Sequence, residues 1–237
     1  MKMMILAPRR DGISHEAFRR YVTEVHGPLV KSVPEVARAI RRYHYNFPVF
    51  GAADLAFNHP IATHLDIVTQ GWFDSREAQL QNMAEPRYLA EIRPDEHRFA
   101  NGAAAVMHYT REVSVLEGAA TAMKVFYFRR RRSQYSREHF QEAWQIRFAD
   151  ALKCNPYLHG VVSRYVQNHT LPEAEHPEGY APKYFDVIDE LNISDAASLG
   201  ALRADGPCMT DVAALESELL EPGYVRALVS ETVINIA

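Results

Sequence analysis

The residues with the clearest chemical potential lie in the segment T-E-V-H-G-P-L-V at 23–30. Apolar residues precede it at helical spacing, and His26 is followed by Gly27 and Pro28, which typically end helices. An unperturbed imidazole titrates at about pH 6.5. A histidine here is therefore suited to take a proton from a carbon acid and return it elsewhere on the same substrate. The alternative is a structural histidine that binds the last carbonyls of its helix.

A second group of polar residues lies in R-R-Y-H-Y-N at 41–46. Side chains three residues apart on a strand lie on opposite faces, so Tyr43 and Asn46 cannot both face one cavity. His44 and Asn46 share a face and are candidates to stabilise an enolate by hydrogen bonds. The alternative is an ordinary strand whose two tyrosines pack in a core.

Asp66 and Asp186 recur inside strands at matching places in the two halves of the chain. A carboxylate in a strand is costly unless it is paired or hydrogen-bonded. We expect Arg42 or Arg164 as the structural partner, with a catalytic base as the alternative for Asp66. Trp72, near the end of the same strand, is expected to supply apolar wall.

The chain contains an internal repeat. Residues 2–46 align without a gap on residues 124–168, and eleven of the 45 paired positions are identical. Average residue usage would give roughly three. The alignment resumes where 64–68 faces 184–188. We infer a tandem duplication, with one unit over 1–115 and the other over 121–237.

Each half predicts the order β-α-β-β-α-β. In the first half we expect strands at 2–7, 38–47, 63–73 and 104–113, a first helix capped by Ser14, and helices at 75–84 and 86–93. In the second half we expect strands at 123–129, 160–169, 183–191 and 225–235, and helices at 136–152 and 194–203. Residues 123–128 are apolar at nearly every position, so both faces of the sheet should be covered. This predicts an α+β fold in which two tandem ferredoxin-like units form one eight-stranded barrel.

Composition narrows the class of protein. The 237 residues are 47% hydrophobic and 24% charged with a net charge of −4, which favours neither nucleic acid nor an anionic membrane. Two cysteines and the lack of a long apolar run indicate a cytoplasmic protein. We find no metal-ligand spacing and no dinucleotide or P-loop motif. We therefore expect no metal, no tightly bound cofactor, and neither nucleic-acid nor membrane partners.

Three further segments are interpreted from composition. The basic run at 129–132 is expected to be a solvated turn rather than a phosphate site. The stretch 169–182, rich in proline and acid, is expected to be a loop. Its apolar counterpart at 47–60 is expected to be a lid over a pocket or a contact surface in a homodimer.

The motifs resemble the EthD family of dimeric α+β barrel proteins. The likeness rests on F-R-R-Y-V-T-E-V-H-G-P-L-V at 18–30, R-R-Y-H-Y-N at 41–46 and L-D-I-V-T-Q-G-W-F-D-S at 65–75. S-R-E-H-F-Q-E-A-W at 136–144 and R-Y-V-Q-N-H at 164–169 are similar to the same pattern. The resemblance implies a small-molecule pocket between sheet and helices, lined by His26 as an acid or base. Relatives include cofactor-free cyclases, dehydratases, decarboxylases and lactone isomerases.

The second half departs from this pattern. It has Phe-Ala-Asp at 148–150 in place of His-Gly-Pro at 26–28. It keeps Asn168 and His169, the ending that the family usually shows on its second strand, where the first half has Phe47 after its asparagine. We therefore expect one working pocket, in the first half.

The sequence predicts a cofactor-independent enzyme that acts by histidine acid/base chemistry on a small hydrophobic, aromatic or polyketide-like metabolite. The candidate catalytic residues are His26 and Asp66. The candidate substrate-binding residues are Tyr21, Tyr43, His44, Asn46, Trp72, Asn168 and His169. Two alternatives are a cofactor-free monooxygenase and a non-catalytic protein that binds a metabolite for a degradation pathway.

Overall fold

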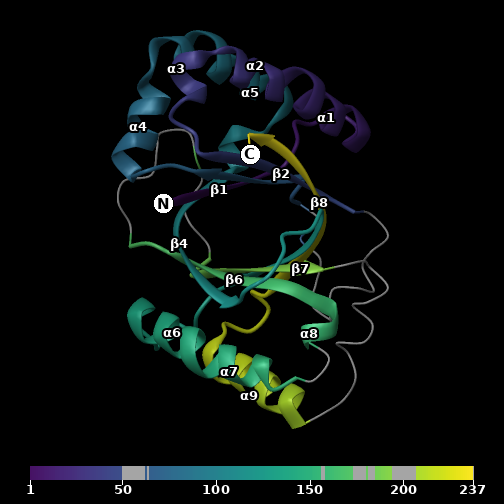
Figure 1. The fold of residues 1–237 in the computed structure, drawn as a ribbon, viewed down its shortest axis with the longest axis vertical. Coiled ribbons are helices and arrows are strands. Elements are labelled where there is room, and N and C mark those ends of the chain that lie inside the picture. The colour runs from purple at the N-terminus through teal and green to yellow at the C-terminus, as the bar shows by residue number, and fades with distance from the viewer. Residues whose placement is uncertain are drawn as a thin grey trace.

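A computed structural model describes residues 1–49, 62, 64–155, 158–172, 180, 185–193 and 207–236. In this part of the chain eight strands form a closed barrel, with helices packed on two opposite sides of its outer wall (Figure 1). The strands are β1 (Lys2–Ala7), β2 (Arg42–Pro48), β3 (Ile67–Trp72), β4 (Val106–Leu116), β5 (Met123–Arg129), β6 (Val162–Thr170), β7 (Val187–Ile193) and β8 (Arg226–Ile236). The predicted eight-stranded α+β barrel is confirmed. None of the helices within these ranges is both long and apolar enough to span a bilayer.

The strand order is the same in both halves. Around the barrel it runs β1-β3-β2-β8-β5-β7-β6-β4, and every neighbouring pair is antiparallel. The first half thus reads β4-β1-β3-β2 and the second β8-β5-β7-β6. The halves meet at two seams, β2 with β8 and β4 with β6. Closure leaves no free sheet edge within the barrel.

Side chains alternate between the barrel interior and the helix layers along each strand. On β1, Met3 packs with helix residues such as Phe18 and Val22, so Met4 and Leu6 on the opposite face point into the barrel. The interior holds an apolar cluster drawn from both halves, which includes Met4, Leu6, Val68, Phe126, Phe128, Ile188 and Leu228. Both faces of the sheet are therefore covered, as the continuous apolar run at 123–128 predicted.

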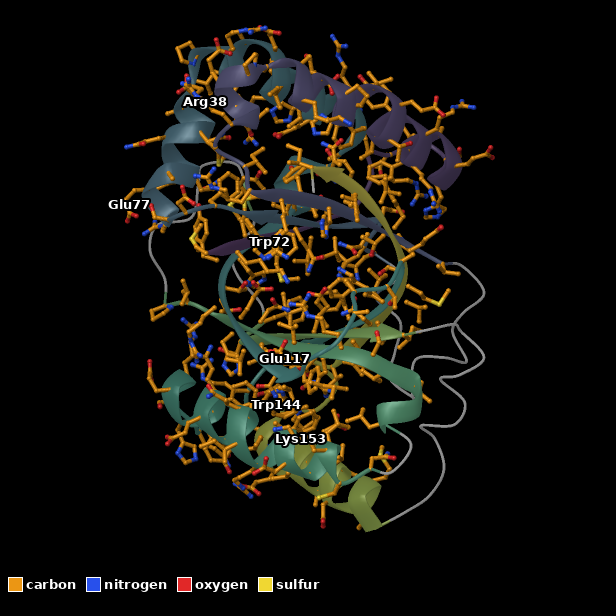
Figure 2. The ribbon with its side chains drawn as sticks, viewed as in Figure 1. Arg38, Trp72, Glu77, Glu117, Trp144 and Lys153 are labelled. Carbon is orange, nitrogen blue, oxygen red and sulfur yellow. The ribbon has the colours of Figure 1, made fainter. Side chains whose placement is uncertain are left out.

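A polar network fills another part of the interior. Lys2 and Lys124, which the internal sequence alignment pairs, each place Nζ 2.7 Å from a carboxylate oxygen of Glu190. Gln70 donates to Glu190 at 2.8 Å and accepts from Lys124 at 3.1 Å. Figure 2 shows Trp72 within the barrel. Because these bonds connect strands of both halves, they help to fix how the halves meet.

The helices cover the outer faces of the sheet. Those of the first half are α1 (His15–Tyr21), the π-helical turn η1 (Val22–His26), α2 (Gly27–Ser32), α3 (Pro34–Ala37), α4 (Arg76–Ala84), η3 (Tyr88–Ile92), α5 (Arg93–Phe99) and the short η4 (Gly102–Ala104). Those described in the second half are α6 (Arg137–Ala143), η5 (Trp144–Phe148), α7 (Ala149–Lys153), α8 (Leu158–Val161) and α9 (Pro207–Leu219). Ser14, Ser75 and Ser136 cap α1, α4 and α6 by accepting a backbone N–H three residues on.

The helical segment around His26 does not end at Gly27 and Pro28, which corrects the prediction. The Gly27 N–H binds the carbonyl of Val22, five residues back. This wider turn accommodates Pro28, which has no N–H and clashes with a carbonyl four residues back in an α-helix. The backbone at Gly27 approaches β8 closely: a Cβ there would lie 2.8 Å from Oδ1 of Asn235, so a larger residue would have to displace that side chain.

Other differences concern the helices that follow the third strand of each half. The second of these in the first half extends to residue 99, beyond the predicted 86–93. In the second half α9 was not predicted, although its buried residues Val212, Leu215 and Leu219 have helical spacing. The helix predicted at 194–203 lies outside the described residues. So do most of the predicted lid at 47–60 and nine of the 14 residues of the loop at 169–182.

Candidate active site

His26 lies in the π-helical turn η1, on the side of the helix that faces the sheet. Its side chain is almost completely buried, and its ring centroid lies 4.7 Å from that of Phe99 on α5. A π-turn changes the register of the helix and so redirects the side chains around it, which is why such turns recur at functional sites. The turn holds the imidazole between the sheet and α5.

Asp95, in the first turn of α5, is the partner of this imidazole. His26 Nδ1 lies 2.9 Å from Asp95 Oδ2, and the Tyr21 hydroxyl donates to Oδ1 at 2.5 Å. The pKa of Asp95 is lowered, and the hydrogen bond from His26 is the largest cause. Burial acts in the opposite direction, and the hydrogen bond from Tyr21 lowers the pKa further. Asp95 is thus a carboxylate that holds Nδ1 protonated and leaves Nε2 for other partners. Tyr21, predicted as a binding residue, supports the pair through this bond.

A cavity of about 60 Å³ lies between the sheet and the helices of the first half, and His26 lines it. Tyr43 and Tyr45 of β2 form part of its wall, and Glu96 of α5 lies across from them. A neighbouring compartment of about 30 Å³ shares Tyr43, Glu96 and Tyr180 with it. Tyr43, one of the candidate substrate-binding residues, thus lines the same cavity as His26.

The Tyr45 hydroxyl is a buried polar group without a partner in the described part of the chain. Its ring centroid lies 6.3 Å from that of His26. Burial raises the pKa of Tyr45, so the hydroxyl keeps its proton near neutral pH. Buried hydroxyl groups nearly always form hydrogen bonds, so this donor is available to an atom that enters the cavity.

His44, Asn46 and Trp72 face the barrel interior instead. Asn46 donates to the carbonyl of Val68 at 2.7 Å, and the His44 ring lies 4.9 Å from that of Trp72. Burial lowers the pKa of His44 to about 4, so it is neutral at physiological pH. The predicted opposition of Tyr43 and Asn46 is confirmed. Strand alternation turns these three side chains away from His26, which corrects their assignment to its pocket.

Asp66 is paired near the end of the first strand, away from His26. Its Oδ2 accepts the Arg9 backbone N–H at 2.8 Å, and its Oδ1 lies 2.7 Å from Arg9 Nη1 and 2.6 Å from His15 Nδ1. Asp186 makes the matching bonds with Arg131. The expected partners, Arg42 and Arg164, were wrong. Because the same bonds between aspartate and arginine occur in both halves, we interpret Asp66 as a structural residue.

The candidate residues of β6 lie on two different faces. Asn168 donates to the carbonyl of Ile188 at 2.9 Å, as Asn46 does to its neighbour in the first half. His169 lies on the helix-facing side, with Nε2 3.0 Å from Gln167 Oε1, and burial lowers its pKa to about 4. Neither residue lines the cavity of His26.

Asp95 and Tyr45 are the site residues that sequence reasoning missed. Asp95 is separated from His26 by 69 positions, so no local spacing connects them. The available signal was an acid in the first turn of a helix after Pro94, where the helix dipole favours a carboxylate. Tyr45 was considered only as a core residue. Among the described residues, no group of three or more histidine, cysteine or acidic side chains is arranged to hold a metal ion.

A model of the EthD domain matches residues 10–103. The conidial pigment biosynthesis dehydratase EthD of Metarhizium robertsii is 31% identical over 114 residues, which cover 44% of this chain and 77% of that protein. Together these matches show that the chain belongs to the EthD family.

Solved structures agree on the barrel. An anthrone oxidase-like protein superposes with a TM-score of 0.64 at 12% identity, over 98% of this chain and 90% of its own. A mutant chlorite dismutase from Candidatus Nitrospira defluvii gives a TM-score of 0.50 at 11% identity, over 97% and 91%. At these identities the likeness shows the fold alone.

Proposed function

We propose that the protein is a dehydratase-type lyase in which His26 performs acid/base chemistry on a small aromatic or polyketide-like hydroxy-carbonyl compound. The likeness to a pigment-biosynthesis dehydratase supports the reaction class. The pairing of His26 with Asp95 beside a cavity supports the role of the imidazole. The single observation that carries the proposal is the Tyr45 hydroxyl, a buried donor with no partner among the described residues, on a side chain that lines the same cavity as His26.

The reaction needs only these side chains. Loss of water from a β-hydroxy carbonyl compound breaks one C–H and one C–O bond and forms a C=C bond. Neutral His26 removes the α-proton through Nε2, while Tyr45 donates to the carbonyl oxygen as negative charge develops on it. The imidazolium, stabilised by Asp95, then returns the proton to the leaving hydroxyl, which departs as water.

The size of the cavity constrains this proposal. An apolar cavity of about 150 Å³ accepts benzene, whereas the two compartments here hold about 60 and 30 Å³. An aromatic substrate therefore needs both compartments and some of the space now taken by the side chains that line both. Tyr180 is one of these, and Arg93 lies over its ring at 5.5 Å. We infer that the Tyr180 ring moves when substrate enters.

A test uses the aldol of benzaldehyde and acetone, whose dehydration gives benzylideneacetone, followed by its ultraviolet absorbance. We expect His26→Asn to lower kcat by about 10²–10⁴ and Tyr45→Phe by about 10². The control is His139→Asn, an exposed histidine of the second half, which should keep full activity. Unchanged turnover in His26→Asn would remove the imidazole from the mechanism. Binding without turnover in the wild type favours an accessory protein, and oxygen consumption favours a monooxygenase.

We also infer that residues 1–115 and 121–237 are tandem ferredoxin-like units from a duplicated ancestor. The common strand order, the π-turns η1 and η5 at paired positions, and the matching bridges Arg9–Ala100 and Arg131–Leu220 support this. Without the second half, β2 and β4 would lose their partners at both seams. We therefore expect a fragment of residues 1–115 to form a homodimer in size-exclusion chromatography; a stable monomer would argue against the inference.

A further inference from the structure

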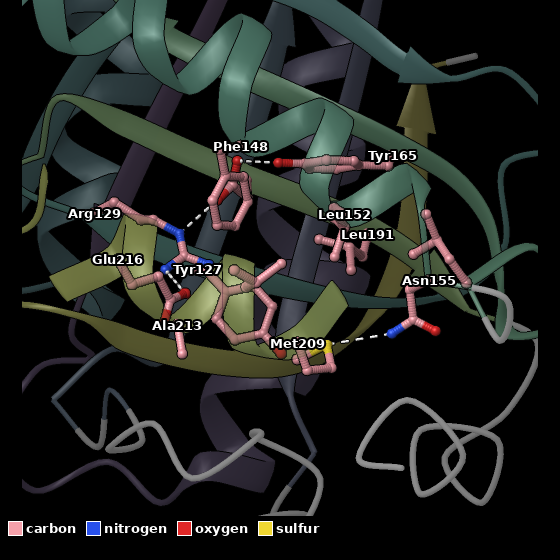
Figure 3. A pocket seen from close by; sticks show the side chains of 13 residues that line it. Tyr127, Arg129, Phe148, Leu152, Asn155, Tyr165, Leu191, Met209, Ala213 and Glu216 are labelled. Atoms are coloured by element: carbon pink, nitrogen blue, oxygen red, sulfur yellow. Dashed lines mark hydrogen bonds and ion pairs between the residues drawn. The ribbon is translucent and has the colours of Figure 1, made fainter. Parts of the chain in front are cut away.

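A second cavity lies between the sheet and the helices of the second half, bordered by β5, β6, β7, η5, α7 and α9 (Figure 3). Its volume is about 210 Å³, several times that of the cavity beside His26. Most of its wall is apolar and includes Leu152, Leu191 and Met209. Its charged groups are Arg129, Asp189 and Glu216, and they bind one another.

Arg129 is the first residue of the basic run that was predicted to be a solvated turn, and this prediction is wrong for it. Its side chain is almost completely buried. Nε donates to Asp189 Oδ2 and Nη1 donates to Glu216 Oε1, both at 2.6 Å. Burial opposes the positive charge of Arg129, but Glu216 and Asp189 together raise its pKa. The guanidinium is therefore charged at the cavity wall.

Asp189 is held from three sides. Besides Arg129, it accepts from the Tyr165 hydroxyl at 2.8 Å and from Trp144 Nε1 at 3.1 Å. Burial raises the pKa of Asp189, which these bonds oppose. With its oxygens engaged by three donors, Asp189 orients Arg129 and presents little to a ligand.

Stability alone does not account for these charges. A buried ion pair is often no more stable than apolar residues of similar volume, because desolvation offsets the attraction. The first half shows that the fold does without it: Ala7 pairs with Arg129 in the repeat, and Thr69 occupies the register position of Asp189. A fixed guanidinium beside an apolar hollow is, however, what a polar ligand atom requires, since Arg offers five donors and two are used here.

We propose that this cavity binds a neutral two-ring aromatic molecule, with a carbonyl or phenolic oxygen placed against Arg129. Since a cavity of about 150 Å³ accepts benzene, 210 Å³ accommodates a fused second ring. The negative charge of Glu216 offsets the positive charge of Arg129, and Asp189 adds no positive charge. The cavity wall therefore carries no net positive charge, and an anionic ligand is disfavoured. The site binds without acid/base catalysis, because Phe148 and Leu215 occupy the positions of His26 and Asp95.

Calorimetric titration with naphthol and naphthoate tests both the site and its charge rule. In the wild type we expect saturable binding of naphthol and a Kd for naphthoate at least about tenfold higher. Glu216→Gln keeps a hydrogen-bond acceptor for Arg129 and removes the negative charge. The ratio of the naphthoate Kd to the naphthol Kd, here called the gap, should therefore fall to less than about threefold. Asp211→Asn, an exposed change on the same helix that is outside the cavity, should leave the gap unchanged.

Two cavity-blocking variants locate the binding. Leu191→Trp places an indole in the cavity and Ala213→Trp places one on the α9 wall, and each should abolish naphthol binding. If Leu191→Trp does not fold, as judged by near-ultraviolet circular dichroism, the exposed Ala213 variant decides. Naphthol binding that survives in a folded blocking variant, or equal wild-type affinity for naphthoate, would overturn the proposal. His26→Asn should bind naphthol normally, so this outcome is independent of the proposed lyase activity.

Discussion

The two halves of this protein place a cavity at the same point of the same framework and give it opposite chemistry. In the first half a titratable pair, His26 and Asp95, borders a space of about 60 Å³. In the second half a fixed guanidinium, Arg129, borders a space of about 210 Å³. The difference depends on a few positions of the helices and strands, while the elements that carry them remain in place.

What the halves share is structural. Each has a serine cap on its first helix, a π-turn directly after that helix, and an aspartate that binds the loop after its first strand. Asp66 binds the backbone and side chain of Arg9, and Asp186 does the same with Arg131. Features that recur at paired positions therefore report on the fold, and features found in one half report on its site.

The largest expected effect on stability comes from replacing Arg129 and Asp189 with the residues at the matching positions of the first half. Arg129→Ala alone leaves Asp189 buried without its main partner and should lower the free energy of unfolding by about 3–5 kcal/mol. The double change Arg129→Ala with Asp189→Thr reproduces the first half and should cost clearly less than the sum of the single changes. Urea unfolding of the four proteins gives the coupling energy.

The control for this cycle is the exposed pair between Arg147 and Glu218. Removing it should cost no more than about 1 kcal/mol, because solvent screens both charges. Additive effects of the Arg129 and Asp189 changes would show that the two residues do not act as a unit.

The difference in volume between the cavities gives a second prediction. Tyr180→Ala removes a ring that lines both compartments of the first half, so aromatic substrates should fit with less rearrangement. We expect KM for the benzaldehyde–acetone aldol to fall by about tenfold, or about 1.4 kcal/mol. Tyr224→Ala, an exposed tyrosine of the second half, serves as the control. A higher KM would show that Tyr180 contributes binding contacts instead.

The fold was largely predictable because its signals are local. The strands at 2–7 and 123–129 have the predicted bounds, and the apolar run in the second one implied that both sheet faces are covered. The burial of His26 beside a cavity was also anticipated, from the family resemblance. The strand bounds and the coverage of the sheet depend on residue type and periodicity within one element.

The chemistry of the sites was less predictable because it depends on contacts between distant elements. Asp95 meets His26 across 69 positions, and Asp189 meets Arg129 across 60. The sequence does not show that Asp189 contacts Arg129, and without that contact a run of four arginines is most simply interpreted as solvated. The helix end predicted at Pro28 was wrong for a different reason. The hydrogen bond in η1 spans five residues instead of four, which removes the steric conflict that normally ends a helix at proline.

A smaller effect tests whether the shared features contribute equally in the two halves. Ser14→Ala and Ser136→Ala each remove a side-chain acceptor at a helix N-terminus. Each should lower the free energy of unfolding by about 1 kcal/mol, and the two should add because the sites are far apart. A much larger cost in one half, measured by thermal unfolding, would show that its first helix depends more on its cap.

The smallest expected effect on stability at neutral pH concerns two buried histidines, His44 on β2 and His169 on β6. Each half has one of them and lacks the counterpart of the other. The internal sequence alignment gives the matched replacements, His44→Val and His169→Phe, because Val166 and Phe47 occupy the paired positions. Burial lowers the pKa of both histidines to about 4, against about 6.5 in an unfolded chain.

Between these two values the unfolded chain binds a proton that each folded-state histidine does not, so stability falls as the pH falls from about 6.5 to about 4. Each replacement removes one such site, and the slope of unfolding free energy against pH should decrease by up to about one proton. His139→Asn, an exposed histidine of α6, is the control. Equal slopes in wild type and both variants would mean that these rings are hydrated in the folded protein, and the contrast between the halves would then lie in their cavities alone.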